Sequence, residues 1–257
     1  MTAPNSAPNS APNSAPNSPV SEAALEQLRH VSTATLTTQL FKRGLRNVFL
    51  QGVAPLVKPE PGTPNLVGPA FTLRNIPARE DLDHVGVFQN PDHPQRKAVE
   101  TAPAGSVLVQ DCRGDRTVAS VGSILALRLA KRGVAGMVSD GPVRDSGTIA
   151  ALGLRIWCAG ASAPLNLAKH HAVDLNVPIA CGGVAVYPGD IVVGDADGVV
   201  IVPHEMAEEV ARDATEQERL EAFITERIES GLALRGTYPP NEETLAAYRV
   251  WCEQQAK

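Results

Sequence analysis

Helix-like and strand-like segments alternate through the middle of this chain, and their spacing limits the folds that it can adopt. An amphipathic pattern predicts a helix over 124–131, and apolar runs predict buried strands over 135–139 and 155–158. A second helix is expected between those strands, over 146–152, and a glycine follows each helix. The connections are only a few residues long. Strands that alternate with helices in this way predict an α/β layered domain.

Further elements extend this pattern on both sides. Upstream, we expect helices from Ser21 and over 33–42, strands over 66–73 and 106–110, and a helix over 93–101. Downstream, short apolar runs separated by turn residues predict a β-meander of strands at 184–186, 190–193 and 199–202. The last two expected helices are 205–231 and 242–252. The predicted fold class is therefore α/β with mixed sheets, as a domain over 21–203 with N-terminal helices and a helical tail over 204–257.

The chain begins with a low-complexity segment. Residues 3–18 are four copies of Ala-Pro-Asn-Ser. Proline at every fourth position excludes a helix, and the segment has no large apolar side chain to bury. We therefore expect residues 1–20 to be a disordered arm.

Composition excludes several classes of protein. No apolar run approaches the roughly 20 residues of a membrane helix. No charged segment followed by an apolar one opens the chain, so we do not expect a secretory signal. A net charge of −5 with 4% aromatic residues argues against a nucleic-acid partner. Cys112, Cys158, Cys181 and Cys252 are widely spaced and form no zinc pattern, which favours free thiols in a cytoplasmic protein.

The richest candidate site lies between Gly114 and Asp145. Gly122-Ser-Ile-Leu125 is placed where a loop becomes a helix, so its backbone amides offer an anion site for a substrate. Asp140 follows a buried strand, where ligands bind in α/β proteins, and Arg144 and Asp145 come soon after. We expect Gly122, Ser123, Ile124 and Leu125 to bind substrate together with Arg144.

Arg144 beside Asp145 suits one kind of chemistry. Asp145 would hold a divalent cation through one oxygen, as Mg²⁺ is usually bound, and Arg144 would bind a carboxylate with two hydrogen bonds. A cation that also meets the keto oxygen of a 2-oxo acid would stabilise charge there, which serves carbon–carbon cleavage or decarboxylation. The alternative is a surface Arg–Asp pair beside an ordinary Asp-Gly turn, with no chemistry.

Four stretches resemble one known family. They are 133–145, which reads Gly-Val-Ala-Gly-Met-Val-Ser-Asp-Gly-Pro-Val-Arg-Asp, and 32–40, 103–109 and 188–203. Together they resemble the RraA-like proteins over about residues 30–210. That family includes the 4-hydroxy-4-methyl-2-oxoglutarate / 4-carboxy-4-hydroxy-2-oxoadipate aldolases and the regulators of ribonuclease activity.

The resemblance implies a swivelling β/β/α fold and a ring-shaped homotrimer with active sites between subunits. It implies a lyase that uses Mg²⁺ or Mn²⁺, acts on 2-oxo acids through a pyruvate enolate and also decarboxylates oxaloacetate. By position, Asp145 would be the metal ligand and Arg144 the residue that binds the pyruvate carboxylate. From its place at the end of a buried strand, we also expect Asp140 to be a catalytic residue.

Two positions depart from the family. Ser123 stands where the aldolases have an Asp, and Thr38 stands where the family often has one. Asp115 or Asp140 are the candidates to replace the carboxylate missing at Ser123. The departures keep two other functions open: a ribonuclease regulator without catalysis, and a metal-assisted dehydratase or isomerase of sugar acids.

Other polar residues are weaker candidates. The adjacent pair His170-His171 points to opposite sides of any helix or strand, so we interpret it as structural rather than as a metal site. Asp81, Asp83, His84 and His93 lie in a predicted loop, where one of them is a candidate general acid or base.

Overall fold

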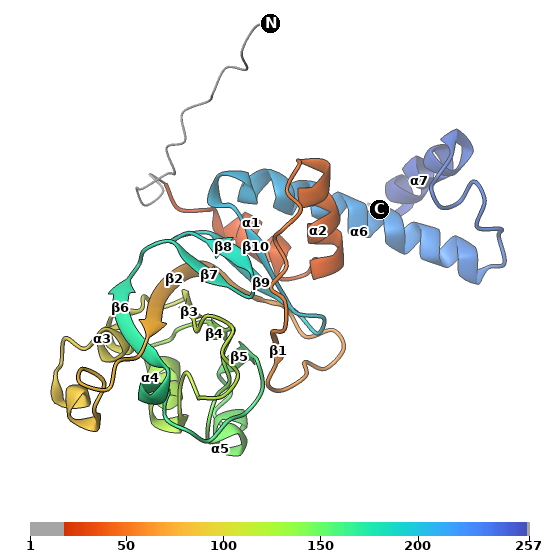
Figure 1. Cartoon of the computed structure of the whole chain (residues 1–257). Coiled ribbons are helices and arrows are strands. Elements are labelled where there is room, and N and C mark those ends of the chain that lie inside the picture. Colours follow the sequence, from red (N-terminus) through yellow and green to blue (C-terminus); the bar gives the residue numbers. More distant parts are fainter. Residues whose placement is uncertain (1–17, 256–257) are drawn as a thin grey trace, which may run out of the picture.

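The structure is a computed structural model in which residues 18–255 are described. Most of the arm predicted for residues 1–20 therefore lies outside the described residues. An eight-stranded mixed sheet forms the centre of the molecule, in the order β1-β5-β4-β3-β2-β9-β10, with β6 also paired to β2 (Figure 1). These strands are Ala54–Pro55 (β1), Leu66–Pro77 (β2), Val107–Asp111 (β3), Gly136–Ser139 (β4), Arg155–Cys158 (β5), His170–Leu175 (β6), Ile191–Gly194 (β9) and Val199–Val202 (β10).

The twelve-residue strand β2 joins two parts of this sheet. Its first residues, Leu66 to Pro69, pair antiparallel with β9, which in turn pairs with β10. Its later residues pair with β3 in parallel and with β6 in the antiparallel direction. Strands β3, β4 and β5 are also parallel, so their carboxyl ends meet at one edge. That edge carries the candidate site.

Helices cover this sheet in two groups (Figure 1). One group joins distant parts of the chain, since α1 (Glu22–Leu28) and α2 (Thr33–Lys42) pack on α6 (Ala207–Glu229). The other group is α3 (Pro94–Thr101), α4 (Ser123–Lys131) and α5 (Ser146–Ala150). The last helix, α7 (Glu242–Gln255), packs on the far end of α6. Short 3₁₀ turns lie at Val85–Gln89, Asn166–Ala168 and His204–Met206.

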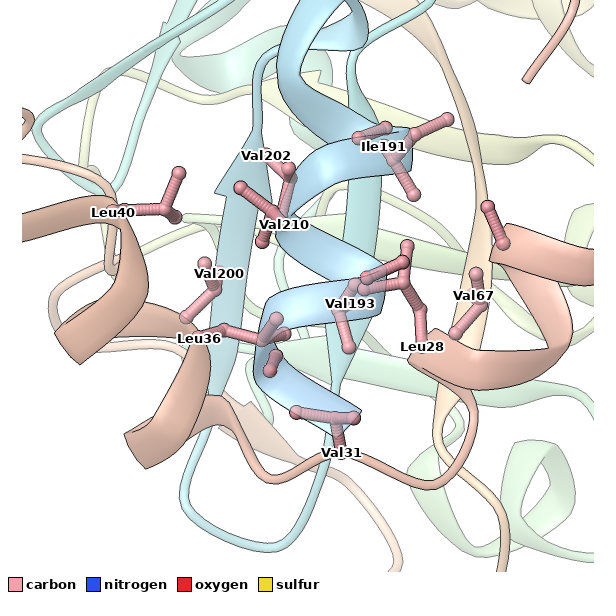
Figure 2. Packing of buried hydrophobic residues seen from close by; sticks show 14 of the residues in the cluster. Leu28, Val31, Leu36, Leu40, Val67, Ile191, Val193, Val200, Val202 and Val210 are labelled. Atoms are coloured by element: carbon pink, nitrogen blue, oxygen red, sulfur yellow. The ribbon is translucent and has the colours of Figure 1, made fainter. Parts of the chain in front are cut away.

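The first core lies between α1, α2, α6 and one face of β9 and β10. Figure 2 shows Val210 of α6 among Leu36, Leu40, Val200 and Val202. Burial of side chains of this size contributes about 1.5–3 kcal/mol each. A second cluster surrounds Trp157, and a third lies under α3, α4 and α5. The first half of α6 thus belongs to the first core.

The predicted helix starts agree with the structure. Ser21 and Ser32 are the N-caps of α1 and α2, and each side-chain oxygen accepts a hydrogen bond from a backbone N–H three residues later. The helices expected over 93–101, 124–131 and 146–152 are α3, α4 and the shorter α5. Among residues 18–255, no helix is both long and apolar enough to cross a bilayer.

The predicted β-meander is confirmed for β9 and β10, which pair antiparallel, but is wrong for its first strand. β8 (Val184–Val186) does not join β9; it pairs with an unpredicted strand, β7 (Ile179–Cys181), in a separate two-stranded sheet. Gly182 and Gly183 both have positive φ, 54° and 77°, and reverse the chain within two residues. Strand β9 lies between β2 and β10 instead. Pairing with distant β2 therefore decides the place of β9.

Candidate active site

The loop after β4 is held between two other segments. On one side, the Ser120 N–H donates to the Pro142 carbonyl at 2.7 Å, and the Arg144 N–H donates to the Val121 carbonyl at 3.0 Å. On the other side, the Ser162 N–H donates to the Val143 carbonyl at 2.9 Å. These bonds bring the predicted loop Arg144-Asp145 beside the predicted start of α4.

Asp145 lies at the N-cap of α5 in the left-handed region, with φ 57°. This backbone conformation costs about 1 kcal/mol for a non-glycine residue, although Asp tolerates it better than most. Its side chain does not cap α5. One oxygen, Oδ2, accepts hydrogen bonds from the Ser123 N–H at 3.1 Å and the Ser123 hydroxyl at 3.0 Å. These bonds lower the pKa of Asp145 below its ordinary value, so the carboxylate is ionised at neutral pH.

Gly122 allows the two side chains to approach α4. A Cβ at this position would lie 2.9 Å from Arg144 Nε and 3.0 Å from Asp145 Oδ2. Its φ of −118° suits any residue, so close approach rather than backbone freedom favours glycine here. The Ile124 and Leu125 amides belong to the first turn of α4, which has no side-chain cap and no earlier carbonyl to accept from them.

Arg144 is free to bind an anion. Its nearest carboxylate is Asp145, with 3.8 Å between Arg144 Nε and Asp145 Oδ2, and its side chain is 43% exposed. No residue between 18 and 255 accepts a hydrogen bond from its guanidinium group. An open cleft of about 350 Å³ lies beside it, lined by residues 143–146 and 161–163. The far wall, Ala161-Ser-Ala163, was not predicted; its only sequence signal is a run of small residues after β5.

The structure therefore gathers most of the predicted site residues. Arg144, Asp145, Gly122 and Ser123 contact one another, and the amides of the first turn of α4 follow directly. The Ile124 side chain is 79% exposed, whereas Leu125 packs partly against the third core. The predicted substrate-binding role of these two residues accordingly rests on their backbone amides.

Asp140 lies outside the cleft. Its buried carboxylate accepts backbone hydrogen bonds from Cys112 at 2.6 Å, Gly114 at 3.0 Å and Gly182 at 3.2 Å. Asp115 bonds to the Thr117 N–H and hydroxyl. Neither carboxylate lines the cleft, and the hydrogen bonds of both are with residues other than Ser123, so neither takes the position that the aldolases' Asp would have at Ser123. Thr38 is exposed on α2 and bonds to its own helix.

The remaining candidates lie in a separate cluster near α3. Asp83, with a side chain only 2% exposed, bonds to His171 Nδ1 at 2.8 Å. His170 is buried on the same strand, in agreement with a structural role for one member of the pair. His93 is the buried N-cap of α3, while Asp81 pairs with exposed Arg79.

The cysteines are free, and their structure does not suggest reactivity. Burial raises the pKa of the Cys112 thiol to about 12, because the thiolate is costly in an apolar site. Burial likewise raises the pKa values of Cys158 and Cys181. None of these thiols is available as a thiolate at neutral pH.

Asp145 suits a cation that keeps most of its water. Within residues 18–255, no cluster of three or more His, Cys, Asp or Glu side chains could enclose a metal ion. Asp145 lines the open cleft, and its Oδ1 accepts no hydrogen bond from these residues. One carboxylate with several waters is a usual Mg²⁺ arrangement, whereas a structural zinc site needs four protein ligands.

The chain is similar to several known proteins. A protein of Halalkalibacterium halodurans with the provisional name 4-hydroxy-4-methyl-2-oxoglutarate aldolase is 33% identical over 194 residues, which are 76% of this chain and 83% of the relative.

Two solved structures share the fold. An uncharacterised protein from Pseudomonas syringae has a TM-score of 0.76 and 27% identity, over 90% of this chain and all of that one. Streptomyces coelicolor RraAS2, described as an unusual member of the RNase ES inhibitor RraA protein family, has a TM-score of 0.70 and 32% identity, over 81% of this chain and 98% of that one. The pattern of the RraA-like family (Aldolase/RraA) matches residues 33–201, so this chain belongs to the RraA-like family.

Proposed function

We propose that this protein is a divalent-metal-dependent carbon–carbon lyase of the 4-hydroxy-4-methyl-2-oxoglutarate aldolase type, with oxaloacetate decarboxylase activity. One observation carries the proposal. The Arg144 guanidinium group, which donates no hydrogen bond to residues 18–255, lies next to the ionised Asp145 carboxylate, beside a glycine at a helix N-terminus. The similarity to a relative provisionally named as this aldolase supports the same reaction class.

Each residue has a distinct task in this reaction. Arg144 and the Ile124 and Leu125 amides bind the carboxylate next to the keto group. Asp145 would hold Mg²⁺ or Mn²⁺, which supplies positive charge to stabilise the charge that develops on the keto oxygen. Ser123 keeps Asp145 ionised and oriented by two hydrogen bonds. Gly122 leaves room for both side chains.

Ser123 also distinguishes two reactions. Aldol cleavage requires a group that removes the proton of the substrate's 4-hydroxyl, whereas decarboxylation releases CO₂ without this step. The Ser123 hydroxyl donates to Asp145 and is no base. We therefore expect oxaloacetate decarboxylation to be less affected than aldol cleavage by the absence of a carboxylate at position 123.

Subunit assembly is part of the proposal. We propose a homotrimer in which a neighbouring subunit covers the open side of the cleft. Ile124 and Leu127, 79% and 43% exposed on α4, are the apolar side chains that such a neighbour would cover. Sedimentation of the full chain tests this, since a monomer mass would exclude the trimer.

Pyruvate release tests the activity. Oxaloacetate and 4-hydroxy-4-methyl-2-oxoglutarate are incubated with the protein and Mg²⁺ or Mn²⁺, and pyruvate is measured against metal alone. We expect release that a chelator abolishes, and a loss of about 100-fold or more for Arg144→Gln because the substrate is no longer oriented. Arg116→Gln, an exposed arginine outside the cleft, is the matched control. An Arg144→Gln variant as active as the wild type would refute the proposal.

A second candidate function follows from the similarity to RraAS2, which is described as an unusual member of the RNase ES inhibitor RraA protein family. A protein of that kind acts by binding and needs no metal at Asp145. Tight, metal-independent binding to an RNA-degrading enzyme, without pyruvate release, would favour it. A screen of sugar acids with metal-loaded protein would reveal a dehydratase or isomerase.

A further inference from the structure

Helix α3 is fixed against the segment that leads into α4. The Gln95 side-chain amide donates to the Ser120 carbonyl at 2.8 Å, and both residues are buried. Toward the other end of α3, Glu100 pairs with Arg128 of α4 at 2.7 Å. The start of α3 therefore lies near the start of α4. Arg96 follows Gln95 directly, so its backbone lies close to this contact between α3 and the segment that leads into α4.

Arg144 reaches the same place from β4. Its N–H donates to the Val121 carbonyl, and its side chain crosses Gly122. The segment Ser120 to Ser123 thus contacts both Arg144 and Gln95, the neighbour of Arg96, although 48 positions separate the two arginines in the sequence. Burial and the positive charge of Arg144 both lower the pKa of Arg96, in agreement with this proximity.

The guanidinium group of Arg96 is positioned but unneutralised. It stacks on the Phe88 ring, with 4.3 Å between Arg96 Cζ and the ring centroid, and Phe88 meets His93 edge-on at 5.3 Å. Within residues 18–255, Arg96 forms no ion pair and no side-chain hydrogen bond. A half-buried arginine in this state lacks the partner that usually offsets its desolvation.

The neighbouring carboxylates are engaged elsewhere. Asp83 bonds to His171 and to the Arg79 N–H, and Asp92 pairs with Lys97. Glu100 pairs with Arg128, and Asp145 accepts from Ser123. Two cationic groups therefore share this region, and the carboxylate nearest to them, Asp145, lies 3.8 Å from Arg144 Nε and is bonded to Ser123. This excess of positive charge favours a ligand with two negative groups over a ligand with one.

We propose that Arg96 is a specificity-determining residue that binds the second carboxylate of a 2-oxo dicarboxylic acid whose first carboxylate is bound by Arg144. The assignment of the first carboxylate rests on the proposed function. The stack on Phe88 orients the Arg96 guanidinium before the ligand arrives, which reduces the entropy lost on binding.

Calorimetric binding of two five-carbon acids tests this proposal. 2-Oxoglutarate has a second carboxylate that 2-oxopentanoate lacks, and each is titrated into the full chain with Mg²⁺. We expect the wild type to bind 2-oxoglutarate at least about tenfold more tightly, and Arg96→Gln to abolish this preference without weakening 2-oxopentanoate. Arg96→Lys should retain part of the preference, because it keeps the charge but not the planar fork.

Lys97→Gln is the matched control, since it removes one positive charge from the next position of α3 and should leave the preference unchanged. A wild type without the preference, or an Arg96→Gln variant that retains it with a native circular dichroism spectrum, would overturn the proposal. An Arg96-dependent preference without pyruvate release would sustain this proposal and refute the lyase. Pyruvate release without the preference for 2-oxoglutarate would support the lyase and refute the proposed role of Arg96.

Discussion

Asp140 and Asp145 are five residues apart after the same strand, yet their surroundings differ. Asp140 is buried and accepts hydrogen bonds from three backbone N–H groups, which use both of its oxygens. Asp145 is 42% exposed at its side chain and uses only Oδ2, toward Ser123. A carboxylate whose two oxygens both accept hydrogen bonds from the backbone stabilises loops. A carboxylate with one oxygen free of hydrogen bonds, in a residue that lines a cleft, is available to a ligand.

The largest expected effect is on activity. Asp145→Asn should reduce metal-dependent pyruvate release by about 100- to 1,000-fold, because the charge that would hold the cation is lost. The side chain is exposed and nearly isosteric, so the thermal midpoint should stay close to that of the wild type. A steady-state assay together with a thermal melt measures both. Full activity in this variant would show that Asp145 does not bind the metal, and the functional difference between Asp145 and Asp140 would be refuted.

The converse effect is expected for stability. Asp140→Ala leaves three backbone N–H groups of Cys112, Gly114 and Gly182 without their acceptor, two of these in buried residues. We expect the free energy of unfolding to fall by about 2–4 kcal/mol. Urea unfolding measures the loss, and Asp115→Ala serves as the control because that carboxylate bonds only within its own turn. A loss below about 0.5 kcal/mol would contradict the structural role.

A smaller effect on activity is expected for Gly122→Ala. The new Cβ would displace Arg144 and Asp145, because it would lie about 3 Å from both side chains. We expect about a tenfold lower kcat/KM, with a stability change of about 1 kcal/mol or less. Kinetics with oxaloacetate test this, and Gly147→Ala, which meets no atom within 4 Å, is the matched control.

The smallest effect concerns His170, near Asp140 and Asp115. Burial lowers the pKa of His170, and burial also lowers that of His93. Each imidazole is therefore protonated more readily in the unfolded chain. Their contribution to stability is complete above about pH 6.5 and is lost as the pH falls toward the folded-state pKa, by at most about 1.4 kcal/mol per unit for each histidine.

Urea unfolding between pH 7.5 and 5.5 measures this dependence. His170→Gln should make the free energy of unfolding less sensitive to pH than in the wild type, whatever its absolute stability. The same pH dependence in both proteins would show that His170 is not kept neutral by the fold.

Local sequence patterns predicted most elements of this fold correctly. The caps at Ser21 and Ser32 and the start of α4 depend on interactions within a few residues, so they can be recognised without the rest of the chain. The pairing of β8 with β7, and of β9 with β2, could not be recognised in this way. Strand partners depend on contacts between segments that are distant in sequence.

The sequence by itself determined most of the helix and strand segments, the family resemblance and the adjacency of Arg144 and Asp145. Only the tertiary structure decided which aspartate remains open, because the donors that surround Asp140 come from two distant loops. It also brought the Ala161–Ala163 wall beside Arg144, and the start of α3 against the segment that leads into α4. Hydrogen bonds within one turn are local, whereas the enclosure of a charge depends on how the whole chain packs.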